Sequence, residues 1–262
     1  MSLRVAVLGA GGRMGQALIN AIEAQDDDGI TLVGALVRAG SAAVGKAAGP
    51  EASYTDQPVS ALDNAEVAID FTLPGAFNSN VTACLEARCP MVIGTTGLSA
   101  AQMTRLRDVG RDLPVVWSPN MSVGVNLCFR LTQLAAAALK KDYDAEIVDE
   151  HHRYKRDVPS GTALHFGELI AAARGQPFDE VKDFRAAGKN RQRHRGAIGF
   201  SSVRAGAEPG KHSVLFCSET ETVEIRHQAM HRGAFADGAL LAARWVSARQ
   251  PGLYTMDDVL GL

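Results

Sequence analysis

The chain begins with a short apolar run, a glycine-rich turn and a helical pattern, and this order constrains its fold more than any other feature. Arg4–Leu8 reads RVAVL, and Gly9–Gly15 reads GAGGRMG. Apolar side chains then recur at the spacing of one helical face, at Met14, Ala17, Leu18, Ala21 and Ile22. The apolar run predicts a buried strand, and the spacing predicts a helix directly after the glycines.

The same alternation continues to about Asn120. Further strands are expected at Leu32–Val37, Val67–Phe71, Met91–Ile93 and Val115–Trp117. Helices are expected around Ala76–Ala87 and after Ser99, which can form a capping box with Gln102. Strands that alternate with helices in this way indicate a parallel sheet covered by helices on both faces.

The pattern changes after Asn120. The elements expected there are a helix from about Val125 to Leu139, a strand at Ala145–Asp149, a helix that opens at Ser160 or Gly161 and ends at Gly175, strands at Ala197–Arg204, Ser213–Ser218 and Thr222–Gln228, and a helix at Phe235–Val246. We therefore predict an α/β protein. A Rossmann-like parallel-sheet domain covers residues 1–122 and 233–262, and an inserted α+β domain with a mostly antiparallel sheet covers residues 123–232.

Composition and charge exclude several classes of protein. The 262 residues are 46% hydrophobic, which is enough for one or two domains, and a net charge of −2 gives no basic excess for nucleic acid or an anionic membrane. The cysteines at positions 84, 89, 128 and 217 form no C-x-x-C pair and no zinc-like spacing with histidine. We expect buried free thiols, no metal site, no membrane span and a cytoplasmic protein.

The glycine-rich turn predicts a dinucleotide site. Gly9, Gly12 and Gly15 let the backbone turn tightly and approach a pyrophosphate, and the helix that follows offers amide N–H groups and a partial positive charge. The spacing is G-x-x-G-x-x-G instead of the simpler G-x-G-x-x-G, so a turn without a ligand is the alternative.

The end of the second strand bears on which dinucleotide binds. NAD-selective sites usually have an acidic residue there, and this chain has Val37 and Arg38. Arg38 can stack on an adenine and contact a 2′-phosphate, which favours NADPH over NADH. A solvated loop residue is the alternative.

Basic side chains are concentrated in one short segment. His151, His152, Arg153, Lys155 and Arg156 fall within six positions. A solvated loop would explain Arg153 and Arg156. The histidines and Lys155 can also hold negative charge, and His151 or Lys155 can handle a proton near neutral pH.

An anion nest is predicted directly after this basic segment. Pro159 precedes a helix cap at Ser160 or Gly161, and the amides of Gly161 and Thr162 with the Thr162 hydroxyl lie at the helix N-terminus. A carboxylate fits such a position, so the segment predicts binding of a small anionic substrate.

Six segments resemble the dihydrodipicolinate reductase family over essentially the whole chain. In order they are GAGGRMG, IDFT, VIGTTG, NMSVGVN, HHRYKRDVPSGTA and GAIGFSSVRAG. The family reduces 4-hydroxy-tetrahydrodipicolinate with NADPH or NADH in lysine and diaminopimelate biosynthesis. The resemblance implies an N-terminal Rossmann domain completed by the C-terminal helices, and an inserted domain that binds the dicarboxylate substrate and assembles a homotetramer.

The resemblance also implies roles for single residues. His151 and Lys155 correspond to the catalytic pair, with Lys155 as proton donor, and His152, Gly161 and Thr162 correspond to the substrate-binding residues. The implied cofactor contacts are Gly9, Ala10, Gly11, Gly12, Arg13, Met14, Arg38, Gly94, Thr95, Thr96, Ser118, Pro119, Asn120 and Met121. The chain departs from the family at Val37, where some members have a Glu that helps them accept NADH, at Tyr154, where a third His is common, and at Leu73, where a polar or basic residue is frequent.

Two other functions would keep the glycine-rich turn. Another two-domain NADP-dependent dehydrogenase of a small anionic substrate need not combine Lys155 with the nest at Ser160–Thr162. A non-catalytic NADP(H) sensor has no reason to keep His151 with Lys155. A second basic run, Arg185–Arg195, is expected to be a solvated loop, with a lid over an anionic substrate as the alternative, and its Arg193 matches an arginine of the family.

Overall fold

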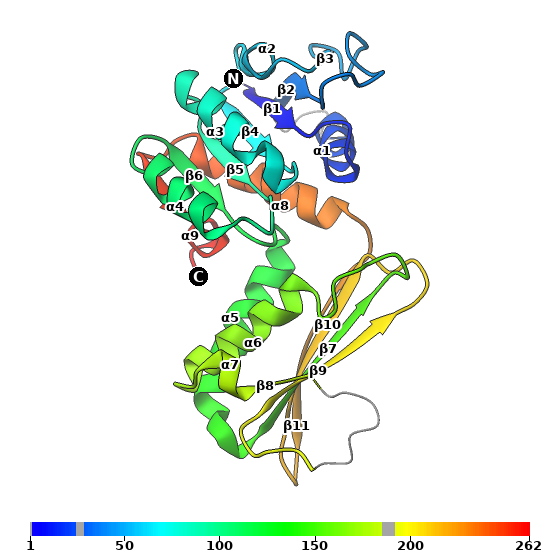
Figure 1. Cartoon of the computed structure of the whole chain (residues 1–262), viewed down its shortest axis with the longest axis vertical. Coiled ribbons are helices and arrows are strands. Elements are labelled where there is room, and N and C mark those ends of the chain that lie inside the picture. The colour runs from blue at the N-terminus through cyan, green and yellow to red at the C-terminus, as the bar shows by residue number, and fades with distance from the viewer. Residues whose placement is uncertain (1, 25–28, 185–191) are drawn as a thin grey trace. The chain divides into compact units, whose positions relative to one another are not determined.

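The computed structural model describes residues 2–24, 29–184 and 192–262, and the chain divides into two compact units. Unit 1 comprises Met1–Val123 and Arg232–Leu262, and unit 2 comprises Gly124–His231. These bounds differ by one residue from the expected domain bounds. Each unit contains its own sheet (Figure 1). None of the helices in the described ranges is long and apolar enough to cross a membrane.

Unit 1 is built on a seven-stranded sheet with the order β12-β6-β5-β4-β1-β2-β3, and its neighbouring strands are parallel. The strands are β1 (Leu3–Leu8), β2 (Ile30–Leu36), β3 (Tyr54–Thr55), β4 (Val67–Asp70), β5 (Met91–Ile93), β6 (Pro114–Trp117) and β12 (Gly252–Tyr254). The helices are α1 (Arg13–Glu23), α2 (Pro58–Leu62), the 3₁₀ turn η1 (Pro74–Ala76), α3 (Phe77–Glu86), α4 (Ala100–Val109), α8 (Gly233–Val246) and α9 (Met256–Leu260).

Strand β1 is buried on both faces. Val5 and Val7 belong to one core cluster, whereas Ala6 and Leu8 belong to the other. A parallel sheet covered by helices on both sides requires this, which is why the strand is continuously apolar and does not alternate with polar residues. Full burial of each large aliphatic side chain contributes about 1.5–3 kcal/mol.

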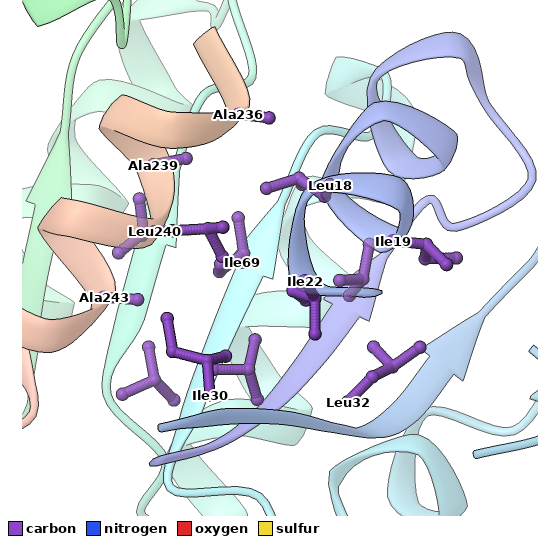
Figure 2. Close-up of a cluster of buried hydrophobic side chains, with 14 of the residues drawn as sticks. Leu18, Ile19, Ile22, Ile30, Leu32, Ile69, Ala236, Ala239, Leu240 and Ala243 are labelled. Carbon is purple, nitrogen blue, oxygen red and sulfur yellow. The ribbon is translucent and has the colours of Figure 1, made fainter. Parts of the chain in front are cut away.

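The C-terminal helix α8 completes unit 1, as expected. Ala239 and Leu240 of α8 pack in the same cluster as Leu18 and Ile22 of α1 and Ile69 of β4 (Figure 2). The predicted fold class, a Rossmann-like domain with a second domain inserted before its last helices, is confirmed.

Unit 2 is an α+β unit with a five-stranded sheet of order β11-β10-β7-β9-β8. Its strands are β7 (Asp144–His151), β8 (Lys182–Phe184), β9 (Ile198–Arg204), β10 (Gly210–Cys217) and β11 (Thr222–Ala229). Its helices are α5 (Val123–Leu139), the 3₁₀ turn η2 (Lys140–Asp142), α6 (Gly161–Ala173) and α7 (Phe178–Val181).

This sheet is mixed, so the expectation of a mostly antiparallel sheet was wrong. β10 is antiparallel to β7 and to β11, but β9 is parallel to β7 and to β8. The physical reason is the connection from β7 to β9: it contains α6, and a crossover through a helix returns the chain in the same direction.

The core of unit 2 lies between its helices and one face of this sheet. Phe129 of α5 and Phe166 of α6 contact edge to face, with ring centroids 4.6 Å apart. They share one cluster with Ile147 of β7 and with Val214 and Phe216 of β10. That face is apolar as far as Ile147, and it becomes polar toward the carboxyl end of β7, where the candidate site begins.

The expectation of buried free thiols holds for two of the four cysteines. Cys84 and Cys89 are buried in a core cluster of unit 1, and burial raises the pKa of Cys89 to about 12. Cys128 and Cys217 are only partly buried. All four are free.

Candidate active site

The glycine-rich turn of unit 1 connects β1 directly to α1. Gly9 has a φ of +85°, which L-residues with side chains rarely adopt. A Cβ at Gly15 would lie 2.3 Å from the Gly9 carbonyl oxygen, so the first turn of α1 packs against the glycine turn itself. Gly12 is the N-cap of α1, and no side chain in the described residues caps it. The main-chain amides at this end of α1 are therefore suited to an anion such as a pyrophosphate.

The glycine turn is fixed to the end of β2. The amides of Gly9 and Ala10 both donate to the Leu36 carbonyl oxygen, at 3.0 and 2.8 Å. Val37 follows in the core, where its side chain lies beside Gly11. Arg38 comes next and is exposed. The structure thus places the predicted Arg38 one residue beyond the core, at the rim of the glycine turn.

Asp70, at the end of β4, organises the neighbouring loops, and the sequence reading did not select it. Its buried carboxylate accepts hydrogen bonds from the Thr72 amide and hydroxyl, both at 2.7 Å, from the Thr95 hydroxyl at 3.2 Å and from the Asn80 amide group at 2.9 Å. The IDFT segment and the GTTG segment are therefore joined at the carboxyl edge of the sheet, beside Gly9.

Four of the predicted cofactor residues are buried: Ala10, Thr95, Ser118 and Met121. The Thr95 hydroxyl is bonded to Asp70 and the Thr72 carbonyl oxygen, Ser118 donates to the Asn120 carbonyl oxygen at 2.7 Å, and Met121 lies in the core. Their side chains shape the edge of the sheet. The side chains and backbone that can contact a ligand belong to the predicted residues that face solvent, such as Gly11, Gly12 and Arg13.

His151 ends β7 in unit 2, and its side chain is buried. Its Nδ1 lies 2.8 Å from Oδ1 of Asp149, the residue two positions earlier on the same face of the strand. Its Nε2 lies 3.0 Å from the place where a Cβ on Gly210 would be. The imidazole is thus bounded by a carboxylate on one side and by a glycine on the other.

Helix α6 begins where the predicted nest requires. Ser160 is the N-cap, and its hydroxyl accepts from the Ala163 amide at 3.2 Å. Gly161 and Thr162 are then the first two residues of a 13-residue helix, whose N-terminal amides favour an anion. Of the two caps considered from the sequence, Ser160 is the one used.

The loop between β7 and α6 carries the remaining predicted residues. Nζ of Lys155 lies 3.0 Å from the Asp157 carboxylate. The His152 amide donates to the Glu208 carbonyl oxygen at 2.8 Å, and its Nδ1 accepts from the Tyr154 amide. Arg153 and Arg156 are exposed, as expected of solvated residues. Lys155 therefore lies on the loop that joins His151, at the end of β7, to the start of α6 within one unit.

Asp149 connects these elements, and the sequence reading missed it. Strand register places His212 of β10 and Ser202 of β9 directly opposite Asp149 on its two sides. The Arg204 guanidinium lies 2.7 Å from Oδ2, and the Ser160 amide donates to the same oxygen at 2.9 Å. The sequence does contain a signal for it, because Asp149 follows Ala145 and Ile147 on the same face of the strand, where an apolar side chain would continue the core.

The surroundings of Asp149 and His212 shift the pKa of each residue. Burial alone would raise the pKa of Asp149, but hydrogen bonds from His151, His212, Arg204 and the Ser160 amide outweigh it and hold the pKa well below its usual range. Burial lowers the pKa of His212, and the Asp149 carboxylate only partly opposes this effect. Asp149 is therefore ionised and His212 neutral at neutral pH.

The same residues form a possible metal-ligand group that the sequence spacing did not reveal. One ligand atom each of Asp149, His151 and His212 lies within 4.8 Å of the others. However, the Arg204 guanidinium already contacts the carboxylate, and a second cation beside it would be repelled. We interpret the group as a hydrogen-bonding network.

The second basic run is only partly described, because residues 185–191 lie outside the described ranges. Arg193 is held on β7 by ion pairs with Glu146 at 2.6 Å and Asp144 at 3.2 Å, and it also donates to two main-chain oxygens. Arg195 pairs with Asp142. Arg193 therefore stabilises this end of the sheet.

Comparisons with known proteins cover both units. The family models described as "Dihydrodipicolinate reductase, N-terminus" and "Dihydrodipicolinate reductase, C-terminus" match residues 3–121 and 124–260. The 4-hydroxy-tetrahydrodipicolinate reductase of Thiobacillus denitrificans is 46% identical over 268 residues, covering 100% of both chains. That of Pseudomonas fluorescens is 47% identical over 266 residues, covering 99% of both.

Solved structures give the same result. A dipicolinate-bound dihydrodipicolinate reductase from Paenisporosarcina sp. TG-14 superposes with a TM-score of 0.79 at 26% identity, over 97% of this chain and 98% of that chain. An amine dehydrogenase from Mycobacterium smegmatis has a TM-score of 0.65 at 13% identity, over 98% of this chain and 96% of that chain. The second likeness extends to the fold alone.

Proposed function

Because the chain belongs to the dihydrodipicolinate reductase family, and is thus an oxidoreductase, we propose that it reduces 4-hydroxy-tetrahydrodipicolinate to tetrahydrodipicolinate in lysine and diaminopimelate biosynthesis. The observation that carries this proposal is local. His151, Lys155 and the N-terminus of α6 lie on one strand–loop–helix segment, where cationic groups and helix amides adjoin. A substrate with two carboxylates requires this combination of fixed positive charge and directed N–H groups.

A nicotinamide cofactor, once bound, supplies the hydride in this proposal. The amides at Gly11 and Arg13 would hold its pyrophosphate, whereas the Gly12 amide already donates to the Gly9 carbonyl oxygen at 2.9 Å and keeps the turn rigid. Exposed Arg38 is placed to contact a 2′-phosphate with a planar, permanently charged group, so NADPH is preferred and NADH is accepted.

The substrate carboxylates are held by unit 2. One lies at the start of α6, against Gly161 and the Thr162 hydroxyl, and His152 and Lys155 offset further negative charge. Removing both fixed charges from water would be unfavourable without these partners. The same contacts orient the ring for hydride addition at a defined carbon.

Lys155 Nζ donates the proton that completes the reduction. Its partner Asp157, 3.0 Å away, keeps the ammonium group close to the loop backbone, and Asp149 orients the His151 imidazole at the end of β7. His151 stabilises the charge that develops as the hydride arrives. Loss of the 4-hydroxyl group as water gives the unsaturated ring, and one hydride and one proton are then added across the unsaturated bond, so that atoms and electrons balance.

We include a homotetramer in the proposal. Helices α5 and α6 cover one face of the unit 2 sheet (Figure 1). Exposed Val203 pairs with Glu150 in strand register and therefore lies on the opposite face. A sheet face of this kind suits association between copies of the chain. The molar mass by light scattering checks it, and a mass of one chain at micromolar concentration would overturn it.

One assay tests the function. Absorbance at 340 nm is followed with NADPH or NADH and with 4-hydroxy-tetrahydrodipicolinate generated enzymatically in the same cuvette. Turnover that requires both the substrate and this protein is expected. Binding of NADPH without turnover would favour a sensor, and turnover only with amino acids or sugars would favour another dehydrogenase.

A further inference from the structure

We infer that Asp149 and Arg204 are positioning residues: together they fix the His151 imidazole, the start of α6 and the Lys155 loop relative to one another. The effect on catalysis rests on the proposed function. The geometric part does not, since it concerns only contacts within unit 2. Neither residue belongs to the basic segment or to the nest.

The two oxygens of Asp149 divide the contacts between them. Oδ1 faces the imidazoles, 2.8 Å from His151 Nδ1 and 3.4 Å from His212 Nε2. Oδ2 faces the helix and β9: it accepts from the Ser160 amide at 2.9 Å, the Ser202 hydroxyl at 3.2 Å and Arg204 at 2.7 Å. A single carboxylate therefore sets the distance between His151 and the N-cap of α6.

The charge at Oδ1, 2.8 Å from His151 Nδ1, also favours one tautomer, although the two atoms do not meet with the directionality of a hydrogen bond. A neutral imidazole that places Nδ1 against an ionised carboxylate carries its proton on Nδ1, which leaves Nε2 as the acceptor. Gly210 leaves room at Nε2, because a Cβ there would lie 3.0 Å away. The ring is thus oriented from both sides, and a change on either side should displace it.

Arg204 extends the arrangement to the Lys155 loop. Its guanidinium donates to the Asp149 carboxylate at 2.7 Å and to the Asp157 carbonyl oxygen at 2.7 Å. The Asp157 carboxylate in turn pairs with Lys155. A continuous series of contacts then runs from His151 through Asp149, Arg204 and Asp157 to Lys155.

Core packing does not require this pair. A fully buried carboxylate costs free energy unless several donors surround it, and an apolar residue in the same place is often as stable. Asp149 stands on the apolar face of β7, two residues beyond Ile147. Orientation of the two proposed catalytic groups, His151 and Lys155, would explain why Asp149 is present at this position.

The chain offers a matched control on the same strand. Glu146 pairs with Arg193 at 2.6 Å, as Asp149 pairs with Arg204, but Glu146 lies on the opposite face of β7. Glu146→Gln therefore removes an ion pair from β7 without touching His151, the N-cap or the Lys155 loop. Asp149→Asn is the corresponding nearly isosteric change at the proposed positioning residue.

Two readouts separate orientation from stability. The first is the tautomer of His151, which is measured in long-range ¹H–¹⁵N spectra of the full-length protein labelled at histidine. The signal of His151 is assigned by its absence from the spectrum of His151→Gln. The second is the split between kcat and the substrate KM in the NADPH assay. We expect Asp149→Asn to lose the Nδ1–H tautomer and about 10–100-fold in kcat, with the KM for NADPH unchanged. Glu146→Gln should keep the wild-type tautomer and kcat even if its melting temperature falls.

Further variants cover the case in which Asp149→Asn does not fold. Gly210→Ala should lower kcat by pressing on Nε2, and Arg204→Lys should raise the substrate KM, because a lysine cannot reach both acceptors with one planar group. An Nε2–H tautomer in the wild type, or an unchanged tautomer and kcat in Asp149→Asn, would overturn the inference. Failure of the proposed function can be told apart from failure of this inference. If the proposed function is wrong, the wild-type protein shows no turnover, whichever tautomer His151 has.

Discussion

Lys155 and Asp157 form an ion pair across two positions of one loop, with Nζ 3.0 Å from the carboxylate. Burial of Asp157 by itself would raise its pKa, but the hydrogen bond and charge of Lys155 lower it. The pair lies partly in solvent, so water screens it and its contribution to stability is small. Its significance is geometric, because it keeps the ammonium group close to the backbone that Arg204 holds.

Lys155→Met should therefore remove catalysis without removing cofactor binding. A general acid contributes about 10²–10⁴-fold to a rate, and we expect kcat to fall by at least about 10²-fold. NADPH binding, measured by fluorescence titration, should be unchanged, because the glycine turn is in the other unit. His151→Ala should also lower kcat, though less. A Lys155→Met enzyme within a fewfold of wild type would refute the assignment of Lys155 as proton donor.

Thr162→Val tests whether α6 holds a substrate carboxylate. The change keeps the shape of the side chain and removes its hydroxyl. A hydrogen bond to a charged group contributes about 1.5–3 kcal/mol, which corresponds to a rise of about tenfold or more in the substrate KM. The KM for NADPH serves as the internal control and should not change. An unchanged substrate KM would place the carboxylate elsewhere.

Arg38→Ala tests the choice of cofactor. We expect a wild-type preference for NADPH of about tenfold in kcat/KM, since the contact is at an exposed edge where salt weakens it. The variant should lose most of this preference by weakening NADPH and not NADH. Because Val37 is packed in the core beside Gly11, Val37→Glu would bury a carboxylate and is a poorer test of cofactor choice than Arg38→Ala. A wild-type preference for NADH would contradict the role of Arg38.

Local signals predicted much of unit 1. The capping box of Ser99 and Gln102 is present, with both hydrogen bonds formed, and the apolar runs are the strands of the parallel sheet. Strand β3 was missed because it is only two residues long, and β12 was missed because it is incompletely buried and lacks the continuous apolar run that marks the equally short β5. The hydrogen bonds around buried Asp70 were missed because they join residues from three separate segments of the sequence.

The site of unit 2 shows the same limit. The segment from His151 to Thr162 was found because its residues are adjacent in sequence. His212 belongs to none of the sequence motifs, and Arg204 belongs only to the segment GAIGFSSVRAG. His212 lies directly opposite Asp149 through strand register, whereas Arg204 lies opposite His151 and reaches Asp149, 55 positions away in sequence, with its guanidinium. Register depends on how whole strands pair, so no local pattern reveals it.

Gly15→Ala should damage the glycine turn. The added Cβ would lie 2.3 Å from the Gly9 carbonyl oxygen and 2.6 Å from Ala10 Cα, and neither backbone atom can move away without shifting the turn. We expect a loss of about 1–3 kcal/mol in the free energy of unfolding and weaker NADPH binding. Gly75→Ala is the control, because a Cβ there meets nothing within 4 Å in the described residues. Equal stability and cofactor affinity in both variants would contradict this account of the turn.

Stability should fall as the pH is lowered from about 7.5 to 5.5. Burial lowers the pKa of His212, and it also lowers that of His227. Each unfolded histidine has a pKa near 6.5, so within this window the unfolded chain binds more protons than the folded chain, and the free energy of unfolding rises with pH. The lowered pKa of Asp149 has no effect in this range, because its contribution is lost only as the pH falls below about 4.

His212→Gln should flatten this pH dependence. The glutamine keeps a side-chain amide near Ser160 and Asp149 but has no group that titrates in the window, so the contribution of His212 to the slope disappears while that of His227 remains. Urea unfolding of wild type and variant at pH 7.5 and 5.5 measures the difference. The sign is the critical result, because a neutral His212 in the folded state requires the wild type to lose more stability than the variant on acidification. If His212 were instead a protonated partner of Asp149, the wild type would gain stability relative to the variant as the pH fell through 6.5, and the description of the network would have to change.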